Sequence, residues 1–145
     1  MSSTSSVSRR QFLASAAALG ATAAWAVPSG RETRVVWRES RERYPEGVAS
    51  GDPSPDSVIL WTRHPGSSSS ALSLVVEVAE DPAFTRVIAH STTTARRELD
   101  WTCRVLVGAL RSRTTYWYRF TDADGAGSRI GRTRTAPLQR RGRAV

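Results

Sequence analysis

Short runs of alternating apolar and polar residues fill the chain from Tyr44 to about Pro137, and clusters of glycine, proline, aspartate and serine separate them. Such runs are typical of short β-strands joined by turns. Six or seven strands can be placed along this part of the chain, with no helical period between them. The pattern predicts an all-β domain, and it favours a two-sheet sandwich of the immunoglobulin or fibronectin type III kind over a barrel.

Alternation along the strands also predicts which side chains face the core. Along residues 72–79 one face is apolar and Glu77 falls on the other, so Glu77 is expected to face solvent. Along residues 115–120 the tyrosines face inward, which leaves Trp117 and Arg119 outward. An exposed tryptophan beside an arginine suggests a contact surface. The residues expected inside are Leu72, Leu74, Val76, Val78, Trp101, Cys103, Val105, Val107, Tyr116, Tyr118 and Phe120.

Two aromatic residues are predicted to support the fold. Trp61, on the strand expected over residues 57–62, is interpreted as the large central core residue of the sandwich, in preference to a role in stacking on carbohydrate. Tyr116 ends a stretch, residues 110–116, that has the spacing of a tyrosine corner. In that motif the phenol hydrogen-bonds to the backbone a few residues upstream and fixes the loop between the sheets.

The first 26 residues, here called the leader, have the features of an export signal. Arg9 and Arg10 precede Phe12 and Leu13, which is the arrangement of a twin-arginine signal, although Ala14 stands where such signals usually carry lysine. An alanine-rich apolar run follows the pair. The alternative is an amphipathic or disordered N-terminus with two chance arginines.

The end of the leader predicts its removal. The small residues Ala24 and Ala26 flank a cleavable bond, so cleavage after Ala26 is expected. The apolar run is too short and too weakly hydrophobic for a stable membrane anchor, since a span needs about 20 strongly apolar residues. We therefore expect export through the twin-arginine machinery to the periplasm or the extracellular space.

Two further segments lie outside the strand pattern. Residues 27–43 are charged and loosely patterned, which predicts a spacer, with a frayed helix as an alternative. Residues 138–145 are rich in arginine and predict a disordered basic tail. Residues 44–137 remain as the predicted domain, a length suited to one modest core.

Charge and cysteine content exclude some functions. All 21 basic residues are arginine, and the net charge is +8. Without the two leader arginines, 19 arginines stand against 13 acidic residues, a net charge of +6. Nucleic-acid binding is not predicted, because these arginines are scattered among acidic residues instead of forming one basic stripe. Cys103 is the only cysteine, so it predicts a core residue and no internal disulfide.

The residues predict no active site. His64 and His90 are the only histidines, and neither has other ligand residues around it at metal-binding spacing. Asp52 and Asp56 flank a proline-containing turn, where aspartate usually accepts backbone hydrogen bonds. No serine lies in a nucleophile elbow, and no glycine-rich loop has phosphate-binding spacing. We therefore expect no catalytic, metal or cofactor-binding residue in this chain.

Four segments in a fixed order resemble the N-terminal domain of PhoD-like alkaline phosphatases. They are residues 44–53 (YPEGVASGDP), 58–63 (VILWTR), 116–120 (YWYRF) and 131–137 (GRTRTAP). In that family a small fibronectin-like sandwich precedes a larger metallophosphatase domain, which uses bound iron and calcium to hydrolyse phosphate esters. A twin-arginine leader is also usual there. The resemblance carries over no catalytic residue, because no position of this sequence matches one.

The resemblance implies an exported, non-catalytic accessory domain that packs against a metallophosphatase domain. The sequence ends in its basic tail where the family continues into metal ligands, so a truncated or frameshifted form is expected. Gly51, Asp52 and Pro53, with Trp117 and Arg119, are the residues expected to contact that domain. The alternatives are a free-standing secreted sandwich that binds polysaccharide or protein, and an enzyme whose metal site comes from a partner chain.

Overall fold

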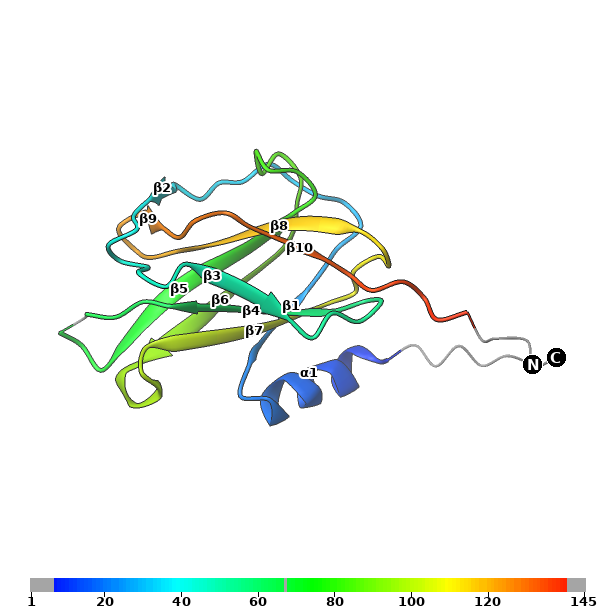
Figure 1. The fold of residues 1–145 in the computed structure, drawn as a ribbon, viewed down its shortest axis with the longest axis horizontal. Helices are drawn as coiled ribbons and strands as arrows, with labels where there is room; N and C mark the ends of the chain where they lie inside the picture. Colours follow the sequence, from blue (N-terminus) through cyan, green and yellow to red (C-terminus); the bar gives the residue numbers. More distant parts are fainter. Residues whose placement is uncertain (1–6, 67, 141–145) are drawn as a thin grey trace.

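The computed structural model describes residues 7–66 and 68–140, which form a β-sandwich with one α-helix on its outside (Figure 1). The remaining residues of the leader and of the predicted basic tail, 1–6 and 141–145, lie outside the described part. The elements are α1 (Arg9–Ala18), β1 (Thr22–Trp25), β2 (Arg38–Glu39), β3 (Val48–Gly51), β4 (Val58–Arg63), β5 (Ala71–Ala79), β6 (Val87–Arg96), the 3₁₀ turn η1 (Arg97–Leu99), β7 (Thr102–Gly108), β8 (Thr115–Thr121), β9 (Ala126–Gly127) and β10 (Gly131–Arg134).

The strands form two sheets with mostly antiparallel pairing. The four-stranded sheet has the order β1-β7-β4-β3, and the six-stranded sheet has the order β2-β9-β8-β5-β6, with β10 also paired to β8. The parallel pairs are β1 on β7 and β2 on β9. This arrangement confirms the predicted all-β, fibronectin-like two-sheet sandwich.

The core lies between the two sheets. On β4, Val58, Leu60 and Thr62 point inward and are fully buried. Thr62 satisfies its buried hydroxyl by donating to the Gly47 carbonyl oxygen at 2.9 Å. Most residues that alternation assigned to the interior are buried, namely Leu74, Val76, Val78, Trp101, Cys103, Val105, Val107, Tyr116, Tyr118 and Phe120. Leu72 is partly buried and packs against them.

Cys103 lies on the inner face of β7. It is 2 % exposed, and burial raises the pKa of its thiol to about 11. The sulfur is therefore a neutral, enclosed part of the core at physiological pH.

Trp61 is not the central core residue that the sequence predicts. It lies between the inward-facing Leu60 and Thr62, so alternation directs its side chain to the outer face of the four-stranded sheet. There it is half-buried and, with Leu19 and Arg104 among its neighbours, lines a hollow of about 410 Å³. The tyrosines and phenylalanine of β8 supply the aromatic core instead.

β6 runs from Val87 to Arg96, although only residues 87–89 at its start form an apolar run typical of a strand. Its pairing with β5 continues to Arg96, which lies opposite Ala71. Thr93 and Ala95 point inward and are buried. Serine and threonine fill most of this second half, so the sequence lacks the apolar alternation that would have predicted it.

Residues 27–43 are neither a loose spacer nor a helix, and we call them the N-terminal strip. From residue 27 to β2 they lie along the six-stranded sheet (Figure 1), and residues 41–43 form a turn after β2. Arg31 forms an isolated antiparallel bridge with Val87, and the Thr33 N–H donates to the Phe84 carbonyl oxygen at 3.0 Å. Near its end the strip contributes β2 to the sheet. Long-range backbone pairing therefore orders a segment that has no local pattern.

The described leader residues pack on the other sheet. α1 lies outside β1 and β7 (Figure 1), where Phe12 and Ala16 form a small apolar cluster with Leu106. β1 adds a parallel strand to the edge of β7. Within residues 7–66 and 68–140, no helix combines the length and apolar character needed to cross a membrane.

Candidate functional site

The residues predicted to contact a partner lie on different sheets. Gly51, Asp52 and Pro53 are exposed at the end of β3, in the four-stranded sheet. Trp117 and Arg119 lie on β8, in the six-stranded sheet. The structure therefore does not join the two groups on the face of one sheet.

Arg119 is buried, which corrects its predicted place on an exposed surface. Its side chain is 7 % exposed, and its Nε and Nη2 atoms donate to Glu77 Oε2 at 3.1 and 3.0 Å. Glu77, predicted to face solvent, has a side chain only 4 % exposed. Thr33 of the N-terminal strip donates its hydroxyl to Glu77 Oε1 at 2.6 Å. Both charged side chains leave the core face as predicted, but the strip covers them.

Two aromatic rings enclose the Arg119 guanidinium. Its Cζ atom lies 4.0 Å from the ring centroid of Phe84 and 5.0 Å from that of Trp37, distances at which a cation and a π-system attract. Trp37 belongs to the strip and donates its Nε1–H to the Ser128 carbonyl oxygen at 3.1 Å. Arg119 therefore fixes the strip to the sheet and is not free to bind a partner.

Trp117 is partly accessible on the outer face of β8. It lies between Ala79 of β5 and Arg132 of β10 in the pairing register, and it is half-buried. Arg119, predicted to be exposed beside it, is covered by the strip, so of these two residues only Trp117 stays a candidate contact residue.

The turn over residues 51–57 is exposed and internally bonded. Asp52 has a φ of 45°, in the left-handed region that aspartate tolerates better than most residues. The hydroxyls of Ser54 and Ser57 lie 2.6 Å apart, and the Ser54 N–H donates to the Ser57 carbonyl oxygen at 2.9 Å. The Ala136 N–H donates to the Ser54 carbonyl oxygen at 3.0 Å. The chain therefore leaves β10 beside this turn.

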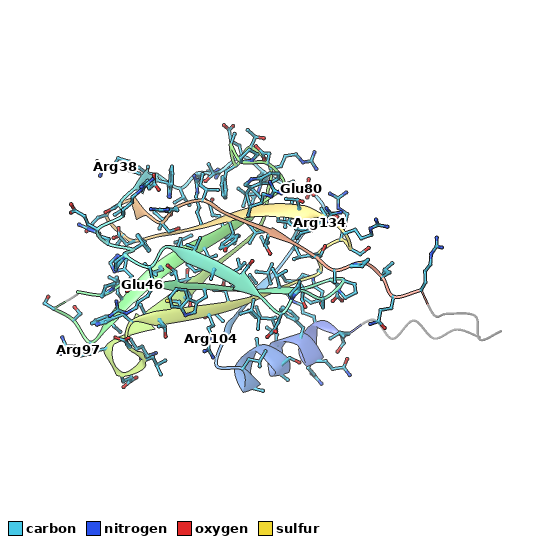
Figure 2. All side chains as sticks on the ribbon, viewed as in Figure 1. Arg38, Glu46, Glu80, Arg97, Arg104 and Arg134 are labelled. Carbon is cyan, nitrogen blue, oxygen red and sulfur yellow. The ribbon has the colours of Figure 1, made fainter. Side chains whose placement is uncertain are left out.

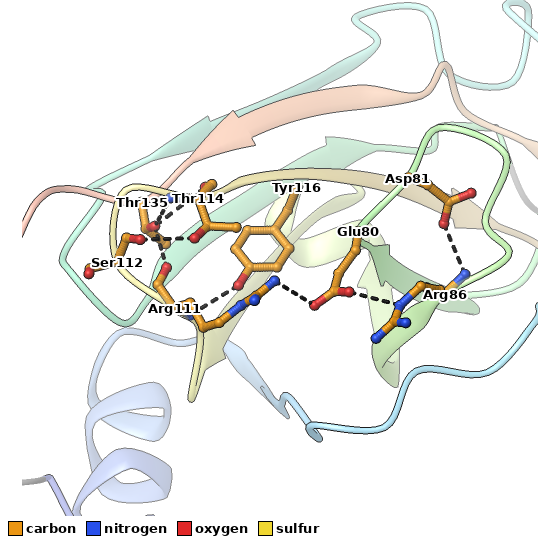
Figure 3. A network of polar contacts seen from close by, with 8 residues as sticks. All are labelled: Glu80, Asp81, Arg86, Arg111, Ser112, Thr114, Tyr116 and Thr135. Atoms are coloured by element: carbon orange, nitrogen blue, oxygen red, sulfur yellow. Dashed lines mark hydrogen bonds and ion pairs between the residues drawn. The ribbon is translucent and has the colours of Figure 1, made fainter.

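Tyr116 anchors the loop that precedes β8. The Arg111 backbone N–H donates to Tyr116 Oη at 3.0 Å, the geometry of a tyrosine corner (Figure 3). Thr135 accepts from the Thr114 N–H at 3.0 Å and donates to the Arg111 carbonyl oxygen at 2.5 Å. The Arg111 guanidinium pairs with Glu80 at 2.9 Å. These contacts connect the loop to the ends of β10 and β5.

A buried polar cluster that the sequence did not predict joins His64 to Asp122. His64 Nε2 lies 3.1 Å from Asp122 Oδ2, and its ring meets Tyr44 edge-on with centroids 4.8 Å apart. Arg43 donates to Asp122 Oδ2 at 2.7 Å. Burial disfavours the charged carboxylate, but its bonds from Arg43, His64 and two backbone N–H groups outweigh that effect and lower the pKa of Asp122. Arg43 precedes Asp122 by 79 positions, so no local spacing could indicate the cluster.

Charged side chains are distributed around the sandwich. Figure 2 labels six of them on separate strands and loops: Arg38, Glu46, Glu80, Arg97, Arg104 and Arg134. His90 is exposed on β6. Across the residues that the structure describes, no group of three or more His, Cys, Asp or Glu side chains could hold a metal ion.

The predicted export motif and cleavage site lie in and beside α1 and β1. The exposed motif residues are Arg9, Arg10 and Leu13. Phe12 is buried, 6 % exposed. Ala24 and Ala26, which flank the predicted cleavage site, are 3 % and 7 % exposed.

The sequence has clear relatives. Residues 29–137 match the family described as PhoD-like phosphatase, N-terminal domain. The match begins inside the N-terminal strip and ahead of Tyr44, in keeping with the packing of the strip on the sandwich. Alkaline phosphatase D of Bacillus subtilis (strain 168) is 36 % identical over 98 residues, which cover 63 % of this chain and 17 % of that protein.

Solved structures give the same assignment. The structure described as that of PhoD matches with a TM-score of 0.64 and 31 % identity, over 74 % of this chain and 20 % of that one. The sensor domain of the anti-sigma factor RsgI4 of Pseudobacteroides cellulosolvens has a TM-score of 0.50 at 14 % identity, over 63 % of this chain and 93 % of its own, a likeness of fold alone. This chain spans only 17 to 20 % of the PhoD relatives. Since the family match covers residues 29–137, the chain belongs to the family of PhoD-like phosphatase N-terminal domains.

Proposed function

We propose that this chain is an exported, non-catalytic accessory domain that acts together with the metal-dependent hydrolase domain of a PhoD-like alkaline phosphatase or phosphodiesterase. The observation that carries the proposal is the match of residues 29–137 to the N-terminal domain of that family. Alkaline phosphatase D is several times longer than the matched region, which leaves room for a separate hydrolase domain. Iron and calcium would belong to that domain.

The turn at Gly51, Asp52 and Pro53 is the proposed main contact with the hydrolase domain. Its residues are exposed, and Ala136 is bonded to the same turn where the chain leaves the sandwich. A domain that followed the sandwich would therefore begin close to it. Trp117, half-buried on the other sheet, is a secondary candidate.

Binding to a hydrolase domain tests the proposal directly. The full chain would be mixed with the metal-loaded hydrolase part of a PhoD-like phosphatase that lacks its own N-terminal domain, and a one-to-one complex is expected in sedimentation velocity. Gly51→Arg places a bulky charge in open space on the turn and should weaken the complex by roughly tenfold. Thr94→Arg, at an exposed site on β6, is the matched control and should leave the affinity unchanged.

Activity and location provide separate tests. Hydrolysis of 4-nitrophenyl phosphate by the full chain alone, above a metal-free blank, would contradict the non-catalytic role. In bacterial cells we expect the chain in the periplasm or medium, and the Arg9→Lys/Arg10→Lys variant in the cytoplasm. Equal export of the two proteins would contradict the twin-arginine assignment. Polysaccharide binding without any hydrolase complex would instead support a free-standing module.

A further inference from the structure

We infer that the outer face of the four-stranded sheet is a binding surface for the leader of the same chain, and that docking there shields the predicted cleavage site from proteolysis. This inference rests on the proposed function, because only an export signal would need to be cut at that point. It concerns a state in which the leader is still attached to the folded sandwich.

Phe12 supplies the central contact of the docked helix. The capping box of Ser8 and Gln11 starts α1, with the Gln11 N–H donating to Ser8 Oγ at 3.2 Å and the Ser8 N–H donating to Gln11 Oε1 at 3.0 Å. Phe12 then lies over Gly108 at the end of β7, where an added Cβ would come 2.4 Å from its ring. Its ring also packs edge-on against Trp25, with centroids 5.0 Å apart. The absence of a side chain at position 108 makes the space that Phe12 fills.

β1 supplies a second, backbone contact. Its register on β7 runs from Thr22 opposite Val105 to Trp25 opposite Gly108. β1 is also bonded to β6, since the hydroxyls of Thr22 and Thr93 lie 2.9 Å apart and a serine hydroxyl of β6 donates to a β1 carbonyl oxygen at 3.1 Å. β1 therefore lies beside strands of both sheets, along one edge of the sandwich.

The predicted cleavage site lies within these contacts. The N–H of the peptide between Ala26 and Val27 belongs to Val27 and donates to the Ile88 carbonyl oxygen at 2.7 Å. The preceding N–H, of Ala26, donates to the Gly108 carbonyl oxygen at 2.9 Å. Ala24 and Ala26 are both buried. A peptidase must bind an extended backbone and the small side chains on it, so this bond can be cut only after β1 leaves the sheet.

The docked leader hides only part of the export motif. Arg9 and Arg10 stay exposed, whereas Phe12 is enclosed against the sandwich. The export machinery can therefore bind the whole motif, and a peptidase can cut the leader, only after the leader leaves this surface.

Limited proteolysis of the full chain tests this inference without any export step. Elastase cuts after small residues, and the rate of its cleavage within residues 20–27 would be followed by mass spectrometry. Gly108→Val changes the sandwich side of the contact and leaves the leader sequence intact, so we expect cleavage about tenfold faster than in the unsubstituted chain. Ser73→Val introduces the same side chain at an exposed site on β5 and should leave the rate unchanged.

A second pair of variants tests the helix side in case Gly108→Val prevents folding. Ala16 is buried against the sheet and Ala17 is exposed, so Ala16→Asp should speed cleavage and Ala17→Asp should not. Equal rates for Ala16→Asp, Ala17→Asp and the unsubstituted chain would overturn the inference. Faster cleavage of the Gly108 and Ala16 variants, in a chain that cells do not export, would support docking and contradict only the proposed export.

Discussion

The outer faces of both sheets are covered by N-terminal residues, but the two covers differ in chemistry. The N-terminal strip lies over the six-stranded sheet and encloses the ion pair of Glu77 and Arg119. The leader lies on the four-stranded sheet through the apolar contact of Phe12 with Gly108 and through the backbone pairing of β1 with β7, and it buries no ion pair. The family match begins at residue 29, so it includes most of the strip and none of the leader.

This difference separates an integral part of the domain from a removable one. Displacing the strip would take the Thr33 hydroxyl from Glu77 and the Trp37 ring from Arg119, and would also break the backbone bonds of the strip to the sheet. A small apolar contact can instead open without leaving any charge unpaired, at a cost set mainly by the area exposed. The strip should therefore unfold with the sandwich, whereas the leader should be able to leave it.

Deletion of the two segments should produce the largest contrast. A chain that begins at Val27 should keep a cooperative unfolding transition in urea, because the strip and the core remain. A chain that begins at Tyr44 should lose that transition, because Glu77, Arg119 and Phe84 would become uncovered. Circular dichroism and tryptophan fluorescence would follow the unfolding. Equal losses for the two deletions would show that the strip is no more integral than the leader.

Glu77→Leu should cause the next largest effect. It leaves the buried Arg119 without its carboxylate partner, so the free energy of unfolding should fall by about 3–5 kcal/mol in urea titration. The double variant Glu77→Leu/Arg119→Met removes both charges and should recover most of the loss. A single variant as stable as the unsubstituted chain would mean that the pair does not hold the strip.

Gly127→Ala should disturb the far end of the strip. A Cβ at this position would come 1.9 Å from the indole ring of Trp37, so the ring must move and the free energy of unfolding should fall by about 1–3 kcal/mol. Gly51→Ala is the matched control, since a Cβ there meets nothing within 4 Å. Its effect should stay within about 0.5 kcal/mol. Equal effects of the two alanines would argue against tight packing of Trp37.

Acid should destabilise the contacts of the strip more than those of the leader, and the contacts of neither should change near neutral pH. The pKa of Asp122 is lowered in the folded state from an unfolded value of about 3.9, so its stabilisation is complete above about pH 5 and is lost as pH falls through the lower folded value. Hydrogen exchange at β2 should therefore accelerate in acid more than exchange at β1. Asp122→Asn should reduce that difference, and equal acceleration at both strands would contradict the assignment.

Alternation predicted the inner faces of the strands because the core demands apolar side chains at every second position. Tyr116 and Leu74 are buried for that reason. The same alternation could not predict which side chains on the outer faces are exposed, since segments far away in the sequence cover some of them. Glu77 and Arg119 leave the core as predicted but are covered by residues more than 40 positions earlier.

The candidate contact surface was predicted least well, because its structure depends on single contacts between residues far apart in the sequence. The strip bonds to several elements in turn, so its sequence has no period. Trp61 shows that a large aromatic residue is not by itself a sign of the central core, since packing on an outer face can also partly bury it. Gly108 and Gly127, at strand ends, were the available signals, because glycine in a strand often marks the close approach of another group.

Because Cys103 is buried, the opening of the sandwich can be measured by labelling its thiol. Its thiol is enclosed between the sheets, and with a pKa of about 11 it is almost entirely protonated at neutral pH. A thiol reagent can reach the sulfur only when β7 separates from the opposite sheet. When labelling is faster than reclosing, each labelled molecule marks one such separation, and the decay of unlabelled protein gives the lifetime of the closed sandwich without an introduced cysteine.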